Sequence, residues 1–244
     1  MTQPPLPPHT KYWTRPEERQ RAVNRMFDRS ASDYDDACAI MSLGSGRAYR
    51  RAALERAGLR EGMHVLDVGT GTGLVAREAR QLIGPSGRIV GIDPSLTMMA
   101  AAGPETAIAF VQGVGERLPL ADGRFDFVTM GYALRHVPDL AQTFREYMRV
   151  LKPGGRVLLL EITRPRSTLG AVLTRLYFGT LVPWLARIGT RSDDVAQLMR
   201  FYWDTIAQSV APEVVLASLR RAGFAADRTV VAGIFSEYTA IRRA

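Results

Sequence analysis

Short apolar runs follow one another along the middle of the chain, and most are separated by segments with helical spacing. Five of them are HVLDV (64–68), RIVGID (88–93), IAFVQG (108–113), FDFVTMG (125–131) and RVLLLEI (156–162). Strands that alternate with helices are typical of βαβ units, whose strands are parallel. Two late runs, RTVVAGI (228–234) and FSEYTAI (235–241), have no helix between them. The pattern predicts an α/β fold with a mostly parallel seven-stranded sheet and an antiparallel last strand.

The segment from Asp139 shows the helical period most clearly. Its apolar residues Leu140, Phe144, Met148 and Leu151 recur at spacings of four, four and three, which places them on one face of a helix. The sequence KPGG (152–155) predicts the end of this helix, because proline blocks its continuation and glycine tolerates a positive φ.

Two regions depart from the alternation of strands and helices. Residues 17–58 have helical spacing with a break around 42–46, which predicts a helical cap of two helices ahead of the sheet. Residues 163–211 have apolar positions three and four apart, which predicts a helical insertion bent near Pro183. The five prolines of residues 1–16 predict a flexible leader, and a chain of 244 residues is consistent with one domain over 17–244.

Composition narrows the classes of function. The single cysteine, Cys38, excludes an intramolecular disulfide framework, and three scattered histidines predict no metal site. The net charge of +8 comes almost wholly from dispersed arginines without an aromatic and basic stripe, so we expect no nucleic-acid partner. The sequence has neither a run long enough for a membrane-spanning helix nor an apolar secretory signal, which predicts a cytoplasmic protein.

The most informative segment is VLDVGTGTG (65–73), where a predicted strand runs into a glycine-rich turn and then a helix. Glycines at such a junction allow a tight turn and let a ligand approach the backbone. The spacing is G-x-G-x-G rather than the G-x-G-x-x-G of dinucleotide-binding proteins, and Asp67 stands just before the turn. A carboxylate there would repel a pyrophosphate but suits the ammonium and sulfonium of S-adenosylmethionine.

A second carboxylate, Asp93, ends the next predicted strand, twenty residues after Gly73. An acidic residue at this place can accept hydrogen bonds from both ribose hydroxyls of a nucleoside. Each carboxylate also has an alternative role that involves no ligand. Asp67 would cap the next helix, and Asp93 would be a turn residue before Pro94. We predict a donor site made of the residues around the ends of the first four strands: Asp67, Gly69, Thr70, Gly71, Thr72, Gly73, Asp93, Pro94, Met98, Gly113, Val114, Gly115 and Gly131.

From Met26 onward the chain resembles the ubiquinone/menaquinone C-methyltransferase (UbiE-like) family. The resemblance is carried by FDRSASDYD (27–35), VLDVGTGTG, ERLPLADGRFDFVTMGYALRHVPD (116–139) and RVLKPGGRVLLLEITRP (149–165). The glycine motif is shared by class I methyltransferases, and the others are more specific to the family. The resemblance implies a Rossmann-like class I methyltransferase fold and methyl transfer from S-adenosylmethionine to a ring carbon of a prenylated quinol or phenol.

The resemblance also implies catalytic residues. The family's Arg-Asn pair after the fourth strand matches Arg135 and His136. Arg135 would stabilise a phenolate, and His136 would accept a proton, since an imidazole pKa near 6.5 suits neutral pH. The alternative for His136 is a polar loop residue. Tyr34 and Asp35 match the family's Tyr-Asp pair and would either close the cap over the substrate or make a structural hydrogen bond within the cap.

Several positions differ from the family pattern. Ala37 and Cys38 replace Met-Asn, Gly46 and Tyr49 replace a histidine and a tryptophan, and Gly131 replaces a serine. Val114-Gly115 replaces the adenine-contacting pair, so backbone groups or Glu116 would have to bind the adenine. A C- or O-methyltransferase of another aromatic or polyketide-like acceptor, and a non-catalytic binding subunit with this fold, therefore stay open as alternatives.

The apolar insertion at 163–211 suits an aromatic or isoprenoid small-molecule acceptor. Its arginines at 164, 166, 175 and 187 would let the same face touch an anionic membrane surface. A lid helix packed on the protein's own core explains the apolar positions without a membrane, and this is the favoured interpretation. The sequence leaves open the identity of the acceptor, the methylated atom and the oligomeric state, including a homodimer.

Overall fold

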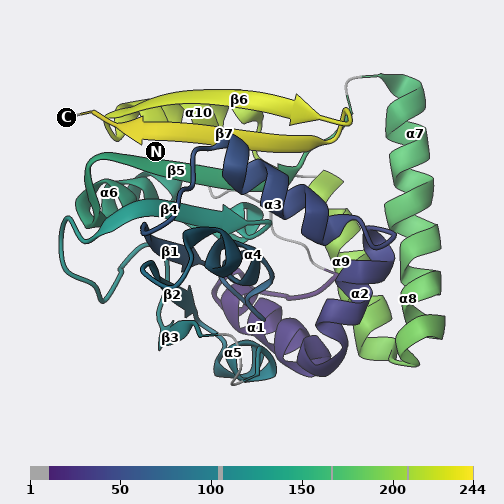
Figure 1. Cartoon of the computed structure of the whole chain (residues 1–244). Helices are drawn as coiled ribbons and strands as arrows, with labels where there is room; N and C mark the ends of the chain where they lie inside the picture. The colour runs from purple at the N-terminus through teal and green to yellow at the C-terminus, as the bar shows by residue number, and fades with distance from the viewer. Residues whose placement is uncertain (1–10, 104–106, 166, 208, 244) are drawn as a thin grey trace.

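A computed structural model describes residues 11–103, 107–165, 167–207 and 209–243 of the chain. Its centre is a seven-stranded sheet in the order β3-β2-β1-β4-β5-β7-β6 (Figure 1). Strands β1 to β5 are parallel neighbours, and β7 runs antiparallel to both β5 and β6. This topology confirms the predicted α/β class and the antiparallel last strand. The strands are β1 (His64–Val68), β2 (Arg88–Asp93), β3 (Ala109–Gln112), β4 (Phe125–Gly131), β5 (Leu151–Ile162), β6 (Phe224–Val231) and β7 (Phe235–Arg242).

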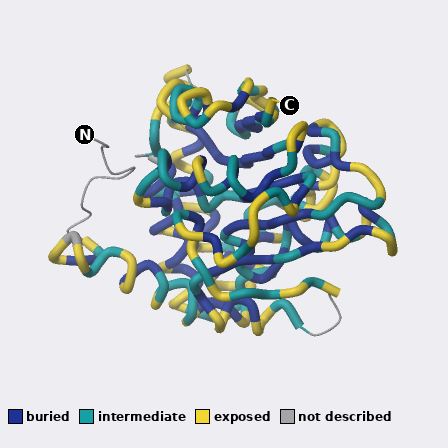
Figure 2. Tube along the Cα trace, turned by 90° about the vertical axis from the view of Figure 1, so that its left-hand side faces the viewer, coloured by how far each residue is buried: buried dark blue, intermediate teal, exposed yellow. Residues whose placement is uncertain are grey.

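Helices cover both faces of the sheet. The helices are α1 (Arg19–Ser30), α2 (Tyr34–Met41), α3 (Gly46–Arg56), α4 (Leu74–Ile83), α5 (Leu96–Ala101), α6 (Leu140–Val150), α7 (Thr168–Leu176), α8 (Val182–Thr190), α9 (Asp193–Ala207) and α10 (Pro212–Arg221). Successive residues of a strand point to opposite faces. Leu66 and Leu159 accordingly pack with α6 and α10, whereas Val65 and Leu158 pack with α3 and α4. The buried strands between these layers form the dark blue centre of Figure 2.

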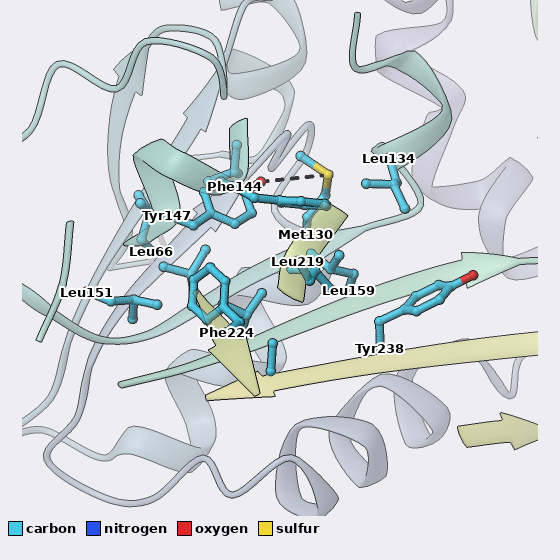
Figure 3. Close-up of a cluster of buried hydrophobic side chains, with 14 of the residues drawn as sticks. Leu66, Met130, Leu134, Phe144, Tyr147, Leu151, Leu159, Leu219, Phe224 and Tyr238 are labelled. Carbon is cyan, nitrogen blue, oxygen red and sulfur yellow. Dashed lines mark hydrogen bonds between the residues drawn. The ribbon is translucent and has the colours of Figure 1, made fainter. Parts of the chain in front are cut away.

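The core between the sheet and α6 contains the large apolar residues that the period of this helix predicts. Phe144 and Tyr147 are fully buried there beside Leu66 and Met130 (Figure 3). The Tyr147 hydroxyl lies 3.8 Å from the Met130 sulfur. The carboxylate of Asp139 caps the helix by accepting a hydrogen bond from the backbone N–H of Gln142, at 3.0 Å.

The strand ends differ from the prediction in two places. β5 begins at Leu151, directly after α6, because Leu151 pairs with Phe125 and the following KPGG segment forms an irregularity before Arg156 pairs with Phe127. β6 begins at Phe224 and ends at Val231, earlier than the predicted 228–234, since the turn to β7 needs positive φ values at Ala232 and Gly233. Both strands therefore include polar residues, and β5 also includes two glycines, that an apolar run does not reveal.

The cap contains three helices rather than the predicted two. The break predicted around residues 42–46 lies at residues 42–45, between α2 and α3. A further 3-10 turn at Ala31–Asp33 separates α1 from α2. Ser32 and Asp33 hydrogen-bond each other in this turn, and short polar side chains of this kind compete with regular helical bonding. Of the predicted leader, residues 1–10 lie outside the described residues, whereas Tyr12 and Trp13 pack on Phe201 of α9.

The insertion is helical, but its irregularity lies elsewhere than predicted. A π-helical turn at Tyr177–Leu181 joins α7 to α8, and Pro183 sits in the first turn of α8. A proline is tolerated in a first turn, so the expected bend at Pro183 is replaced by the π turn that precedes it. The insertion and the cap share a second core that includes Val23, Val182 and Leu198, and it meets the sheet at Ile162, the last residue of β5.

Candidate functional site

A cavity of about 510 Å³ lies where β1, β2 and β4 end. In a sheet of this kind, ligands bind outside the carboxyl ends of the strands where the strand order reverses, and here β1 stands between β2 and β4. The predicted donor-site residues all line the cavity except Gly73. Helices α1, α2 and α9 supply the remaining walls, so the cavity has a sheet side and a cap side.

The glycine-rich turn brings the backbone against the cavity. Gly69 has a φ of +67°, and a Cβ atom there would lie 2.7 Å from the Cβ of Ala133, so a side chain has neither the conformation nor the space. Gly73 is the N-cap of α4 with a φ of +83°. Because Gly73 does not line the cavity, its part in the turn is conformational, and the prediction that it contacts the donor is not supported by its position.

Asp67 is a buried carboxylate at the end of β1. Its Oδ2 accepts a hydrogen bond from the Thr70 hydroxyl at 2.7 Å, while its Oδ1 has no hydrogen-bond partner among the described residues. Burial raises the pKa of Asp67 to about 7, and the Thr70 hydroxyl opposes this rise. A buried carboxylate oxygen without a partner is costly unless a ligand donates to it. An ammonium group fits this requirement.

Asp93 ends β2 and is held by backbone donors. Its Oδ2 accepts from the N–H of Gly71 at 2.8 Å, and its Oδ1 accepts from the N–H of Ser95 at 2.9 Å. Burial raises its pKa, and these two hydrogen bonds oppose the rise. Each carboxylate oxygen has a second lone pair, so the orientation of Asp93 is fixed while acceptor capacity remains for ribose hydroxyls.

A third carboxylate, Glu116, lines the cavity next to Val114 and Gly115. Its Oε1 is buried without a hydrogen-bond partner among the described residues. Burial raises the pKa of Glu116, and backbone hydrogen bonds from Glu116 and Asp139 oppose the rise. Since the side chain of Val114 offers no polar atom, Glu116 is the acidic side chain available to an adenine amine at this end of the cavity.

Side-chain hydrogen bonds connect the cap to the sheet side of the cavity, where the donor-site residues lie; we call this the donor side. Asp35 of α2 accepts from the Thr72 hydroxyl at 2.6 Å and from Arg77 at 2.7 Å. Asp28 of α1 pairs with the Ser95 hydroxyl. The hydroxyl of Thr72 is therefore occupied by the cap, and the glycine-rich turn and the cap form one continuous wall.

Aromatic side chains gather on the cap side of the cavity. The hydroxyls of Tyr34 in α2 and Tyr202 in α9 lie 2.5 Å apart, and both residues line the cavity. The ring of Phe27 in α1 lies 6.0 Å from each of their rings. Burial raises the pKa of Tyr202 to about 12, opposed by Arg135. Burial also raises the pKa of Tyr34, so the tyrosine pair remains protonated near neutral pH.

Arg135 is placed differently from what the resemblance implied. It is buried and does not line the cavity. Its Nη1 lies 2.6 Å from Glu161 and its Nε donates to the Thr205 hydroxyl at 3.1 Å, while its guanidinium lies 4.4 Å from the centre of the Tyr202 ring. Arg135 thus stands behind Tyr202 in a buried ion pair, because a guanidinium out of water needs a carboxylate partner. The expected direct contact with a phenolate does not fit this position.

His136 lines the cavity, but its environment does not suit a general base. Its ring lies between Phe27 and Phe201, at 5.5 and 5.6 Å between ring centres. Neither ring nitrogen has a hydrogen-bond partner among the described residues. Burial, together with the charges of Arg135 and Arg19, lowers the pKa of His136 well below its usual 6.5. The sequence-based expectation of an ordinary imidazole pKa is therefore wrong, because burial beside the Phe27 and Phe201 rings removes water from the imidazole.

Tyr202 and Glu161 are site features that the sequence did not single out. Tyr202 lies within the predicted insertion, where many aromatic residues have similar spacing and no local pattern shows which of them faces the cavity. Glu161 ends an apolar strand run, and a charged residue within such a run is the one available signal of a buried partner.

The sheet order, the glycine-rich turn and the two strand-end carboxylates define a class I S-adenosylmethionine-dependent methyltransferase. The sequence profile of the ubiE/COQ5 methyltransferase family matches residues 14–242, and the chain belongs to this family.

Similar proteins of known sequence agree with this family. A ubiquinone/menaquinone biosynthesis C-methyltransferase UbiE of Pseudomonas paraeruginosa is 32% identical over 243 residues, covering 96% of this chain and 93% of the relative. A demethylmenaquinone methyltransferase of Roseiflexus castenholzii is 42% identical over 175 residues, covering 70% of this chain and 73% of the relative.

Solved structures agree with the fold. Human N-acetylserotonin methyltransferase in complex with S-adenosylmethionine matches with a TM-score of 0.63 at 19% identity, covering 95% of this chain and 61% of that one. A methyltransferase of Thermotoga maritima matches with a TM-score of 0.63 at 19% identity, covering 90% and 99% of the two chains.

Proposed function

We propose that the protein transfers the methyl group of S-adenosylmethionine to a ring carbon of a prenylated quinol or phenol. The observation that carries this proposal is that one cavity joins an acidic, glycine-lined side to an aromatic side. The volume of about 510 Å³ lies within the usual range of small-molecule sites, about 300–1,000 Å³. Relatives named for quinone methylation are similar over nearly the whole chain.

Three carboxylates would hold the donor. Asp67 would accept the ammonium group at its unpaired Oδ1, Asp93 would accept from the ribose, and Glu116 would accept from the adenine amine. When bound, S-adenosylmethionine supplies an electrophilic methyl group. The three carboxylates would orient this group, because they would hold the two ends and the sugar of the donor.

The tyrosine pair would orient the acceptor. One hydroxyl of the pair donates to the other, so the pair has one further hydroxyl hydrogen, for which an oxygen of the acceptor ring would compete with Cys38 beside Tyr34. A ring carbon becomes a better nucleophile as negative charge builds up on the neighbouring ring oxygen, and a hydrogen bond donated to that oxygen stabilises the charge. Arg135 acts through Tyr202 and is a positioning residue in this arrangement.

His136 and Phe27 would exclude water beside the acceptor. The lowered pKa keeps the imidazole neutral, and its ring lies against those of Phe27 and Phe201, at 5.5 and 5.6 Å between ring centres. We infer a role in the shape and polarity of the acceptor side rather than in storing a proton.

A second candidate is methylation of another aromatic or polyketide-like acceptor at carbon or oxygen. The observation that favours it is the position of Cys38. This residue differs from the family pattern and lines the cavity beside Tyr34, so the acceptor side has a different shape at that point.

The test is incubation with methyl-labelled S-adenosylmethionine and a panel of demethylated prenyl quinols, phenols and polyketide aromatics, with Asp67→Asn as the matched control. We expect the label on a ring carbon of a prenylated quinol and none with the control. Label on oxygen, or only on an acceptor without a prenyl chain, would establish the second candidate. Binding of S-adenosylhomocysteine without transfer to any acceptor would instead identify a non-catalytic subunit.

A further inference from the structure

We propose that the helix Thr168–Thr190 docks the protein on an anionic lipid bilayer through an exposed apolar face. This inference concerns a surface outside the cavity, and it does not depend on which acceptor is methylated. In Figure 1, α7 and α8 form one long column along the edge of the molecule. The sequence-based expectation of no candidate span is corrected here: although Arg175 and Arg187 interrupt its apolar run, this is, within the described ranges, the one helix long and apolar enough to cross a membrane by length and composition. Only 28% of its apolar 18-residue stretch is buried.

Large apolar side chains of this helix point to solvent. Seven of them have exposed fractions between 42 and 69%, and Trp184 among them is 58% exposed. They are Leu169, Val172, Leu173, Leu176, Leu181, Trp184 and Ile188. Single exposed apolar residues are ordinary, but a continuous exposed apolar surface marks an interaction site.

The π turn places these residues on one face. In an unbroken α-helix, at about 100° per residue, Leu181 and Ile188 would stand about 120° and 100° from Leu169. A π turn holds roughly one extra residue, which sets the following residues back by about 100°. Leu181 and Ile188 then come within about 20° of Leu169. The turn at Tyr177–Leu181 therefore aligns the exposed apolar residues of α7 with those of α8.

The charges beside this face favour anionic lipid as the occupant. Residues 168–190 contain two arginines, Arg175 and Arg187, and no acidic residue. Both arginines are exposed, and the same helical phase puts them on one flank of the apolar face, about 100–120° away from it. Arg187 also pairs with Asp193 of α9 at 2.7 Å. Arginine beside an apolar stripe can reach lipid phosphates while the stripe enters the bilayer interface.

A second copy of the chain is a poorer occupant of this face. If two copies packed through the same helix, neither helix would offer a carboxylate to the arginines of the other, because residues 168–190 contain none. Lipid phosphates supply the missing negative charge.

The helix is arranged to lie on a membrane rather than to cross it. Its inner side buries Phe178, Val182 and Ala186 in the core that it shares with the cap. The Tyr177 hydroxyl donates to the carbonyl of Met41 at 3.0 Å, and Met41 lines the cavity. Crossing the bilayer would require this packing to be broken. Docking leaves it intact and brings the cap side of the cavity close to the lipid surface.

The test is sedimentation of the protein with vesicles of phosphatidylcholine alone and of an equimolar mixture with phosphatidylglycerol. We expect binding to the mixed vesicles, a loss of about tenfold or more in partitioning for Leu173→Glu, and a loss of about fivefold for Arg175→Gln. Arg175→Lys should retain the binding. Val214→Glu is the matched control, because Val214 is 50% exposed on the distant helix α10 and should be neutral.

Tryptophan fluorescence gives a second measurement that a folding defect would not imitate. Trp184 should be quenched by brominated lipids in the mixed vesicles, and Trp184→Phe should remove the quenching while the melting temperature stays unchanged. Three results would overturn the proposal: no vesicle binding by the wild type, an equal loss for Val214→Glu, or self-association without lipid that Leu173→Glu abolishes. The last result would assign the face to a second copy.

Discussion

The two sides of the cavity are built in different ways. On the donor side, the backbone N–H groups of Gly71 and Ser95 hold the carboxylate of Asp93. The glycine-rich turn there is a single short segment of the chain. On the acceptor side, α1, α2 and α9 bring together residues as distant in sequence as Tyr34 and Tyr202, and side-chain contacts alone connect them.

This difference determines what a substitution can change. The backbone frame of the donor side tolerates loss of a side chain without losing its shape, so changes there should appear in ligand affinity. The acceptor side depends on buried side-chain pairs, above all Arg135 with Glu161, so changes there should appear first in stability.

The largest expected effect is on the buried ion pair. Glu161→Ala should lower the free energy of unfolding by about 3–5 kcal/mol, because it leaves the Arg135 guanidinium buried without a counter-charge. Urea denaturation measures this. The double variant Arg135→Leu/Glu161→Leu should recover most of the loss. Equal losses in the single and double variants would mean that the pair is not the element that supports the acceptor side.

The next largest effect is on donor affinity. Asp67→Asn should weaken S-adenosylmethionine binding by about 3 kcal/mol, roughly a hundredfold, because the ammonium loses a desolvated carboxylate. Calorimetric titration measures the affinity, with Asp122→Asn as the control, since Asp122 is exposed and pairs with Arg149. An unchanged affinity in Asp67→Asn would remove Asp67 from the donor site.

A smaller effect is expected for the tyrosine pair. Tyr202→Phe should lower kcat about ten- to thirtyfold. This corresponds to a rise of about 1.5–2 kcal/mol in the activation free energy, as expected for the loss of a hydrogen bond to a charged group. Donor affinity should stay unchanged, because Tyr202 belongs to the acceptor side. The matched control is Tyr147→Phe, which removes a hydroxyl from the core beside Met130 and should leave kcat unaltered. If both variants lose activity alike, the effect is one of packing.

The smallest effect is the pH dependence of donor binding. In the free protein the pKa of Asp67 is about 7, and a bound ammonium favours its ionised form. Affinity should therefore be constant above about pH 7 and fall as the pH drops below it, by at most about tenfold per pH unit. Calorimetry in buffers of different ionisation enthalpy should detect proton release near neutral pH, and Asp67→Asn should abolish it. Proton uptake on binding would contradict this assignment.

The same contrast explains what the sequence could predict. Periodicity located every strand of the sheet because buried strands have apolar runs, and the spacing of VLDVGTGTG with Asp93 indicated the donor side because that side is built from local segments. The position of Arg135 was not predictable, since its partners Glu161 and Thr205 lie 26 and 70 residues away. The lowered pKa of His136 comes from burial by Phe27 and Phe201, which only the tertiary structure brings together.

Two irregular turns were not predicted from the sequence because periodicity does not reveal a local change of helix geometry. Apolar spacing predicted helices over 163–211, but it could not reveal a π turn, because one extra residue in a turn leaves composition and hydropathy unchanged. The turn at Ala31–Asp33 was missed because the segment around it keeps helical spacing.

The central claim is that an S-adenosyl nucleoside lies along the acidic side of the cavity with its ribose on Asp93. Calorimetric titration of S-adenosylhomocysteine into the wild type and Asp93→Ala tests it most directly. The account predicts one-to-one binding that Asp93→Ala weakens by about 1–3 kcal/mol, because hydrogen bonds to the ribose are lost. No binding to the wild type at near-millimolar ligand, or equal affinity in the variant, would contradict it.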